Sequence, residues 1–326
     1  MLNRRSLILG SSAAVTLFFS SGEAPAADDF PNRPITIIVP YAAGGSSDTL
    51  VRLVGVEVSE GVKQSVIIDN RGGGGGAIAA FAVKQAAPDG YTLLLGHSGT
   101  HVFTPVLFPN SIRYDPLNDF AMITPLISFP TILLVPADHP AKSVEELVRL
   151  ARSKPGGLTY ASQGVGNTAH IIGEMFRVRA NIPLVHVPYK GGNPALTDLI
   201  AGRVDMMFSS YLSSGAHVEA GKLRMLALAA EQRSPHLPEL PTMAEAGVPA
   251  VGIDTWFGIM APKHTPDTII STLHREFVNA AKSNRVRDHV LPTGADIIPM
   301  PPEEFAKKIA SDIERVRQIA REAHII

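Results

Sequence analysis

The sequence predicts an α/β fold of two lobes with mainly parallel sheets, and three observations support this. Short β-branched runs alternate with segments of helical spacing along most of the chain, which is the pattern of strand–helix units. The 326 residues suffice for two lobes, each with a core of its own. Two glycine-rich polar loops, far apart in the sequence, each connect a predicted strand to a predicted helix, which indicates one such loop per lobe.

The first strand–helix unit begins with residues 35–39, an unbroken run of Ile, Thr and Val typical of a buried strand. Apolar residues then recur at helical spacing over residues 48–58, and we expect the side chain of Ser46, Ser47 or Asp48 to cap this helix. Later units repeat the pattern. The further predicted strands span residues 66–68, 91–95, 131–135, 158–161, 185–187, 204–208 and 223–229.

Helices are predicted between and after these strands. Ser143 and Glu146 form a capping box at the start of one helix, and Thr265 precedes a proline and an acid at the start of another. The predicted helices lie near residues 77–87, 143–152, 169–178, 195–201, from 267 onward, and 303–323. In such sheets ligands bind beyond the carboxyl ends of strands, where loops enter helices, so a site is expected there.

Composition excludes several classes of function. The formal net charge is −1, which argues against binding of nucleic acid, whose backbone requires a basic surface. It has no cysteine, which excludes disulfides, thiolate zinc sites, a thiol nucleophile and a lipid-modified cysteine. No spacing of two carboxylates, or of a nucleophile and a base, compels catalysis. We therefore expect no cofactor and no metal.

The N-terminus predicts an export signal. Arg4 and Arg5 form a basic segment, residues 7–19 form a short apolar run, and a small-residue cleavage site ends at Ala26, so residues 1–26 are expected to be removed. The arginine pair also resembles a twin-arginine signal, and the sequence leaves both export routes open. A membrane anchor is less favoured, because the apolar run is shorter than the roughly 20 residues that a span needs.

Two loops are the main candidates for a ligand site, the first at residues 41–48 and the second at 162–170. Glycine lets the backbone approach a ligand closely, and the free N–H groups of a helix's first turn attract an anion. Either loop alone fits a flexible connection with a good cap, but the pair indicates two ligand-binding loops that face each other, one from each lobe. These loops are called the first jaw (residues 41–48) and the second jaw (residues 162–170). The candidate ligand-binding residues here are Tyr41, Ala43, Gly44, Gly45, Ser46, Asp48, Ser162, Gly164, Asn167, Thr168 and His170.

Other motifs carry weaker signals. The glycine run at residues 72–76 fits a dinucleotide fingerprint only because five glycines fit almost any glycine pattern, and a tight surface turn is favoured instead. Residues 96–100 nearly match a hydrolase nucleophile elbow, and His97 and His101 have the spacing of a metal pair on a helix. Glycine and β-branched neighbours nevertheless predict a loop at this strand end, with Ser98 available to a ligand.

Three single residues allow two interpretations each. Asp205, among apolar neighbours, is either directed at the cleft or a satisfied buried carboxylate. Tyr189 follows a predicted strand and can face the cleft, while the adjacent Lys190 fits a solvated position. His170 is more often a packed histidine at a helix start than an acid–base. We include Asp205 and Tyr189 among the candidate ligand-binding residues.

Several ordered blocks of residues resemble one known family. They are residues 33–36, 39–41, 43–48, 88–94, 160–170, 186–191, 237–247 and 256–258. In this order they resemble the Bug-type solute-binding proteins of tripartite tricarboxylate transporters, over essentially the whole chain after residue 26.

The resemblance implies the type II periplasmic binding fold, with a hinge between two lobes. The first lobe would comprise residues 27–128 and 254–326 and the second residues 129–253, with crossings near Phe129 and Asp254. It also implies a periplasmic, non-enzymatic and monomeric protein. Such a protein holds a small organic carboxylate with backbone groups and waters at the two turns, and delivers it to the permease subunits of a membrane transporter.

The chain departs from the family pattern at three places. A glycine run replaces the usual Arg-Pro-Gly-Ala-Gly-Gly segment, Asn167 interrupts a common Gly-Thr pair, and His97 and His101 are unexpected residues that can shape ligand choice.

Two alternatives stay open: an α/β enzyme of hydrolase type that uses Ser98 or His170, and a sensor component whose liganded form contacts a membrane receptor. The sequence does not identify the carboxylate.

Overall fold

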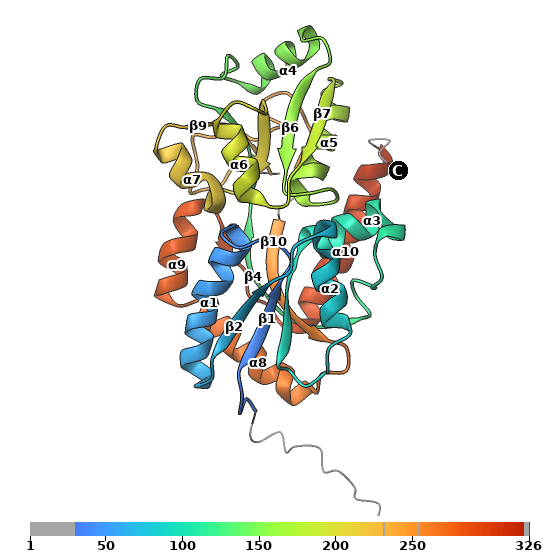
Figure 1. Ribbon diagram of the computed structural model, residues 1–326, viewed down its shortest axis with the longest axis vertical. Coiled ribbons are helices and arrows are strands. Elements are labelled where there is room, and N and C mark those ends of the chain that lie inside the picture. Colours follow the sequence, from blue (N-terminus) through green and yellow to red (C-terminus); the bar gives the residue numbers. More distant parts are fainter. Residues whose placement is uncertain (1–29, 231, 253–254, 323–325) are drawn as a thin grey trace, which may run out of the picture. The chain divides into compact units, whose positions relative to one another are not determined.

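The computed structural model describes residues 30–230, 232–252, 255–322 and 326. The predicted signal segment at residues 1–26 lies outside this part of the chain, as does Asp254, where the second crossing was expected. From Pro31 onward the chain forms one compact unit. Within it the strands assemble into two sheets, each with its own helices (Figure 1).

The first sheet has six strands in the order β11-β4-β10-β3-β1-β2. They are β1 (Ile35–Val39), β2 (Val66–Asn70), β3 (Thr92–His97), β4 (Phe120–Phe129), β10 (Thr255–Pro262) and β11 (Asp296–Ile297). β1 pairs in parallel with both β2 and β3, whereas β10 pairs antiparallel with β3 and β4. This sheet therefore unites N-terminal and C-terminal parts of the chain, and the region built on it is called the first lobe.

The second sheet has five strands in the order β7-β6-β8-β5-β9. They are β5 (Thr131–Pro136), β6 (Leu158–Ser162), β7 (Leu184–Pro188), β8 (Met206–Ser209) and β9 (Leu223–Ala229). β6 pairs in parallel with β7 and β8, and β5 pairs antiparallel with β8 and β9. The region built on this sheet is called the second lobe.

The expectation of mainly parallel sheets is corrected, because only four of the nine strand pairings among the described residues are parallel. The reason lies at the crossings. β4 leads through Pro130 directly into β5, so one nearly continuous extended segment serves both sheets, and β10 returns beside β4 in the opposite direction. The residue boundaries of the two lobes stay a prediction.

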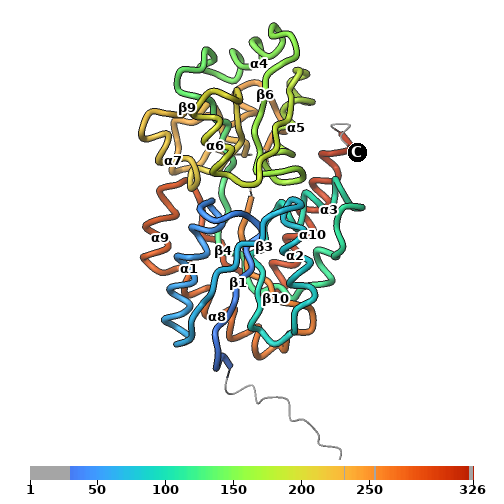
Figure 2. Tube along the Cα trace, viewed as in Figure 1, coloured from blue at the N-terminus to red at the C-terminus, as the bar shows by residue number. Residues whose placement is uncertain are grey.

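Helices cover both sheets, and α1 lies beside α9 although the two are far apart in the sequence (Figure 2). Arg285 of α9 pairs with Glu57 of α1 at 2.8 Å, which links these ends of the chain. The first-lobe helices are α1 (Ser46–Val62), α2 (Ala77–Lys84), α3 (Thr104–Leu107), α8 (Asp267–Ala281), α9 (Asn284–Val290) and α10 (Pro302–Glu322). The second-lobe helices are α4 (Val144–Ser153), α5 (Thr168–Arg179), α6 (Gly192–Ile200) and α7 (Tyr211–Glu219).

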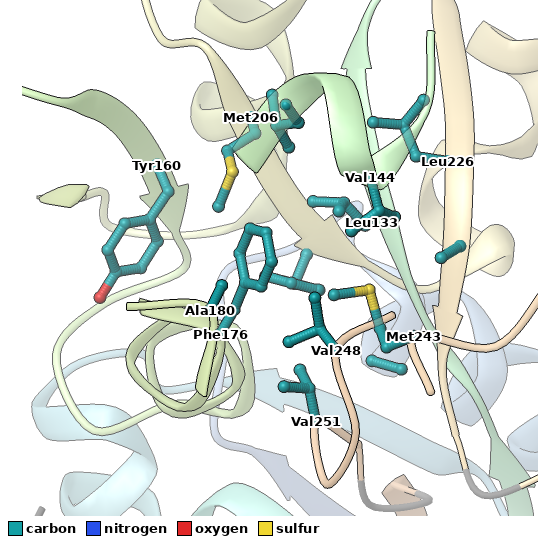
Figure 3. Packing of buried hydrophobic residues seen from close by; sticks show 14 of the residues in the cluster. Leu133, Val144, Tyr160, Phe176, Ala180, Met206, Leu226, Met243, Val248 and Val251 are labelled. Atoms are coloured by element: carbon teal, nitrogen blue, oxygen red, sulfur yellow. The ribbon is translucent and has the colours of Figure 1, made fainter. Parts of the chain in front are cut away.

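Each lobe has an apolar core. In the second lobe, Phe176 of α5 packs with Leu133 of β5, Met206 of β8 and Met243 (Figure 3). The first-lobe core includes Trp256, which is fully buried and donates from Nε1 to Asp312 at 3.0 Å. These cores hold the strand ends, and hence the loops after them, in fixed positions. None of the described helices combines the length and the apolarity that crossing a bilayer requires.

Several local expectations are confirmed and others are wrong. Ser143 caps α4 by accepting from the Glu146 N–H at 3.1 Å, as the capping box predicts. The predicted cap of α1 is wrong, because Gly45 occupies the cap position and no side chain caps the helix. The loop predicted around His101 is also wrong: residues 99–103 form a wide helical turn that continues into α3. Strands β4 and β10 and helices α7 and α9 were not predicted.

Candidate functional site

A pocket lies between the two lobes, at the carboxyl ends of β1, β3, β6 and β8. It encloses about 560 Å³ of empty space, open solvent included. Gly45 and Thr168, one from each predicted jaw, line this same pocket. The first lobe contributes Tyr41, Ala42, Gly45, Ser46, Ser47, His97, Phe129, Thr255 and Phe257, and the second lobe Thr131, Gln163, Asn167, Thr168, Ala169, Gly192, Phe208, Ser209, Ser210 and Ser213.

Four helices begin at this pocket: α1, α5, α6 and α7. The first turn of a helix has backbone N–H groups without partners inside the helix, and the aligned peptide dipoles add a partial positive charge there. Each such terminus favours an anion by roughly 0.3–2 kcal/mol. The sequence predicted two of these termini as jaws, and the structure brings two more to the same place.

The first jaw follows β1. Gly44 has a φ of +83°, a left-handed backbone that favours glycine, and the side-chain amide of Asn193 from the second lobe lies close to it. The Gly44 N–H donates to Asp48 at 2.9 Å, which folds the loop over the helix start. Ser46 N–H donates across the lobes to Ser213 Oγ at 3.2 Å.

Asp48 does not line the pocket, but it accepts a hydrogen bond from Gly44 and so stabilises the conformation of the first jaw. Its side chain is buried and accepts from Arg52 Nε at 3.0 Å. Burial alone would raise the pKa of this carboxyl, but the hydrogen bonds from Arg52 and from the Gly44 N–H outweigh burial and hold the pKa below its usual value. The Asp48 charge is thus already paired and does not repel an anion at full strength.

The second jaw follows β6. Asn167 caps α5 by accepting from the His170 N–H at 3.0 Å, and its side-chain amide donates to Gln163. Ser162 is fully buried beneath the loop, where its Oγ lies 2.7 Å from His186 Nε2 and donates to the Gly164 carbonyl at 3.1 Å. Asn167 and Thr168 therefore line the pocket, while Ser162 and Gly164 hold the loop in shape.

Two histidines stack under the second jaw. The rings of His170 and His186 lie 4.0 Å apart at 20°, and the Gly166 N–H donates to His170 Nδ1 at 3.1 Å. Burial lowers the pKa of His170, and burial together with His170 lowers the pKa of His186 to about 4. Both rings are therefore neutral at physiological pH, and neither lines the pocket.

A third strand-to-helix turn, after β8, was missed by the sequence analysis. Ser209 ends β8, Ser210 occupies the cap position of α7, and Ser213 lies in its first turn. All three line the pocket. The signal was available: residues 204–208 were predicted as a strand, and the serine pair after it meets the same rule that identified the other jaws.

Two buried hydroxyls in the pocket have no hydrogen-bond partner within the described chain. They are Thr168 Oγ1 and Ser209 Oγ, in side chains that are 7% and 2% exposed. An unpaired buried hydroxyl costs about 1–3 kcal/mol, so most such groups in proteins are satisfied. Two of them at one pocket leave hydrogen-bonding capacity there for a bound molecule or for water.

The lining residues include no Asp, Glu, Lys or Arg side chain. Hydroxyls, amides and backbone N–H groups are the polar groups that face the space, and Tyr41, Phe129, Phe208 and Phe257 add aromatic surface. Such a lining can hold an anion through dipoles and hydrogen bonds. It offers no carboxylate pair for acid–base chemistry.

The structure does not bring every predicted site residue to the pocket. Asp205 precedes β8, at the opposite end from the loops, and accepts from Thr159 N at 2.6 Å, from Thr159 Oγ1 at 2.7 Å and from Lys154 at 3.0 Å. Of the two interpretations given for Asp205, the structure supports the one in which the carboxylate is satisfied by hydrogen bonds within the protein. Tyr189 donates to Asp198 at 2.8 Å, and its side chain does not line the pocket.

Two further predicted residues have positions other than those expected. Ala43 is exposed at the turn before the helix and does not line the pocket. Ser98 is buried, and its Oγ accepts from the Trp256 N–H at 2.9 Å, so it fastens the end of β3 to β10 instead of facing a ligand. His101 is fully buried, and the described residues contain no group of three or more metal-ligating side chains.

Comparisons with known proteins agree with this architecture. The family model described as "Tripartite tricarboxylate transporter family receptor" matches residues 50–325. The UPF0065 protein in the tcbD–tcbE intergenic region of Pseudomonas sp. strain P51 is 37% identical over 319 residues, covering 98% of this chain and 94% of that protein. Protein BugT of Bordetella pertussis is 34% identical over 296 residues, covering 91% of each chain.

Solved structures of similar proteins include two with small acids. An R. palustris protein solved with adipate is 34% identical with a TM-score of 0.86, covering 91% of this chain and 99% of that one. MatC of Rhodopseudomonas palustris, with bound malate, is 33% identical with a TM-score of 0.84, covering 89% and 99%. The periplasmic binding protein BugD is 28% identical with a TM-score of 0.86, covering 91% and 99%.

Proposed function

This chain belongs to the receptor family of the tripartite tricarboxylate transporters, and on that premise we propose that it captures a small organic carboxylate between its lobes. It does so outside the cytoplasm and delivers the ligand to the membrane permease of such a transporter. The observation that carries the proposal is the meeting of Gly45 and Thr168, at the starts of α1 and α5, on one pocket lined by no charged side chain.

The pocket's polar groups suit a carboxylate. Helix N-termini from both lobes supply backbone N–H groups and partial positive charge, and a carboxylate accepts hydrogen bonds through both oxygens. Thr168 Oγ1 and Ser209 Oγ add donors that have no partner within the described chain. The similar proteins solved with adipate and malate support a dicarboxylate or hydroxy-acid ligand here.

The proposed protein binds its ligand without changing it. Ser162 and His186 have the separation of a nucleophile and a base, 2.7 Å, but Ser162 is fully buried and directed into its own loop. His170 Nδ1 is engaged by the Gly166 N–H, and Ser98 by the Trp256 N–H. The residues considered for hydrolysis therefore have structural hydrogen bonds in place.

Titration calorimetry with adipate, malate, citrate and other small acids tests the proposal. We expect at least one to bind and to raise the thermal unfolding temperature. Thr168→Val and Ser209→Ala should each weaken binding about 3- to 10-fold and leave stability equal or higher, because each removes an unpaired buried hydroxyl. Thr272→Val, at a half-buried position on α8 that does not line the pocket, is the control. No binding by folded protein across the screen contradicts the proposal.

A further inference from the structure

His97 has an unusual place at the floor of the pocket. It ends β3, is 6% exposed and lines the pocket. Its ring packs beside two phenylalanines that also contact each other, with centroids 4.8 Å from Phe257 and 6.4 Å from Phe129. The edge of Tyr41 meets it at 5.5 Å. These three aromatic residues also line the pocket, so His97 is the one nitrogen-bearing ring in an aromatic floor.

The hydrogen bonds of His97 define which ring nitrogen carries its proton. The Gly99 backbone N–H donates to Nδ1 at 3.1 Å, and the Tyr41 hydroxyl lies 3.0 Å from the same atom. A backbone N–H can only donate, so Nδ1 must be an acceptor without a proton. A neutral imidazole then carries its hydrogen on Nε2.

The ring is neutral because its surroundings disfavour charge. Burial, with a smaller contribution from His101, lowers the pKa of His97 to about 3. The titratable groups that face it are Tyr41 and His101. The Nε2–H is thus a fixed, uncharged donor over the whole physiological range of pH.

This donor has no protein partner in the part of the chain that the structure describes. Both hydrogen bonds of the ring go to Nδ1. His97 Nε2 is not among the fully buried atoms that lack a partner, so it is accessible, and the pocket is the space that His97 lines. A molecule in the pocket is therefore the natural acceptor.

We propose that His97 is a specificity-determining residue that presents Nε2–H to the pocket and selects organic acids with a hydrogen-bond acceptor at the end away from the bound carboxylate. The proposal rests on the proposed function, which places the carboxylate at the helix N-termini. An acid that ends in a methyl group leaves Nε2–H unpaired against the aromatic floor. An acid with an ether, carbonyl or second carboxylate oxygen at that end satisfies it.

Matched ligand pairs measure this selection. Adipate and hexanoate differ by a terminal carboxylate against a methyl group, and 4-methoxybenzoate and 4-ethylbenzoate differ by an ether oxygen against a methylene. In at least one pair we expect the acceptor-bearing acid to bind about tenfold more tightly, which is the effect of one hydrogen bond. Equal binding within both pairs, or binding of no member, overturns the proposal.

Two variants assign the preference to the donor. His97→Phe keeps an aromatic ring beside Phe129 and Phe257 but removes Nε2–H, and we expect the preference to fall to about twofold or less. His97→Gln keeps an amide donor and should retain most of it. An unchanged preference in His97→Phe overturns the proposal and leaves the proposed function intact, because the acids still bind.

A spectroscopic measurement on the unaltered protein does not depend on the variants folding. A long-range proton–nitrogen spectrum of labelled protein should show His97 with an unprotonated Nδ1 and a protonated Nε2 at pH 7, and ligand binding should shift Nε2 more than Nδ1. A protonated Nδ1, or no shift at Nε2 with a bound acceptor-bearing acid, contradicts the inference.

Discussion

Substitution of Gly75 by alanine should weaken ligand binding without acting on the pocket itself. Gly75 lies in the glycine run before α2, in the first lobe, with a φ of +64°. A Cβ there would lie 2.9 Å from the Val165 carbonyl oxygen and 3.5 Å from the Gly166 carbonyl carbon, both in the second-lobe jaw. The glycine run therefore contacts the backbone of the second jaw when the lobes meet.

Two costs of this substitution can be separated. A left-handed backbone costs a residue with a Cβ about 1–2 kcal/mol, and this cost applies whether the lobes are together or apart. The contact with the second-lobe backbone applies only when they meet, and overpacking of this kind costs about 1–3 kcal/mol. Because binding requires the lobes to meet, the second cost alone weakens affinity, by about 5- to 150-fold.

Gly74→Ala is the matched control. Gly74 has a similar φ of +58°, but its Cβ would meet only Ala77 and Ile78 of the first lobe, at ordinary distances of 3.6 and 3.9 Å. Thermal unfolding should therefore show similar losses of stability for both variants, and titration calorimetry with a bound acid should show weakened affinity for Gly75→Ala alone. Equal affinities in the two variants would refute the idea that close contact between Gly75 and the second jaw is needed for tight ligand binding.

Three further outcomes are expected. Thr104→Val removes a hydroxyl that donates to the Gly166 carbonyl across the lobes at 2.8 Å, so calorimetry should show a 2- to 10-fold loss of affinity, whereas Thr104→Ser should restore it. Asp205→Asn should lower the free energy of unfolding by about 1–3 kcal/mol in urea titrations and leave affinity unchanged; a selective loss of affinity would return Asp205 to the site. Burial lowers the pKa of His170 and lowers that of His186 to about 4, so the unfolded chain binds more protons than the folded chain between pH 6.5 and 4. As the pH falls through this window, the thermal unfolding temperature should therefore fall, and it should fall less steeply in His186→Phe. An unfolding temperature that does not change with pH would be inconsistent with buried neutral rings.

The strand–helix units were predictable from sequence because each depends on local pattern. The Ile and Val run of β1 and the capping box of α4 are signals that lie within the element itself and need no distant contact. Both elements formed where expected. β4 was missed although it is the longest described strand, Phe120–Phe129. It contains Pro125, which normally argues against a strand, and a register shift on its partner β10 beside that proline accommodates it.

Site residues were predictable to the extent that the chain direction fixes them. Gly45 and Thr168 follow strands directly, and loops after strands meet at one edge of a sheet, so both reach the pocket. Asp205 precedes its strand and falls at the other edge. Side-chain direction was beyond the sequence: Ser98 adjoins His97, yet only His97 faces the pocket, because the Trp256 N–H engages Ser98 from a strand more than 150 residues later.

The hydrogen bond between Ser46 and Ser213 joins the two lobes at the pocket itself. Ser46 N–H lies in the first turn of α1, where an anion would bind, and it already donates to Ser213 Oγ of the second lobe. A carboxylate oxygen is a stronger acceptor than a hydroxyl, so we expect a bound carboxylate to compete with Ser213 Oγ for this N–H.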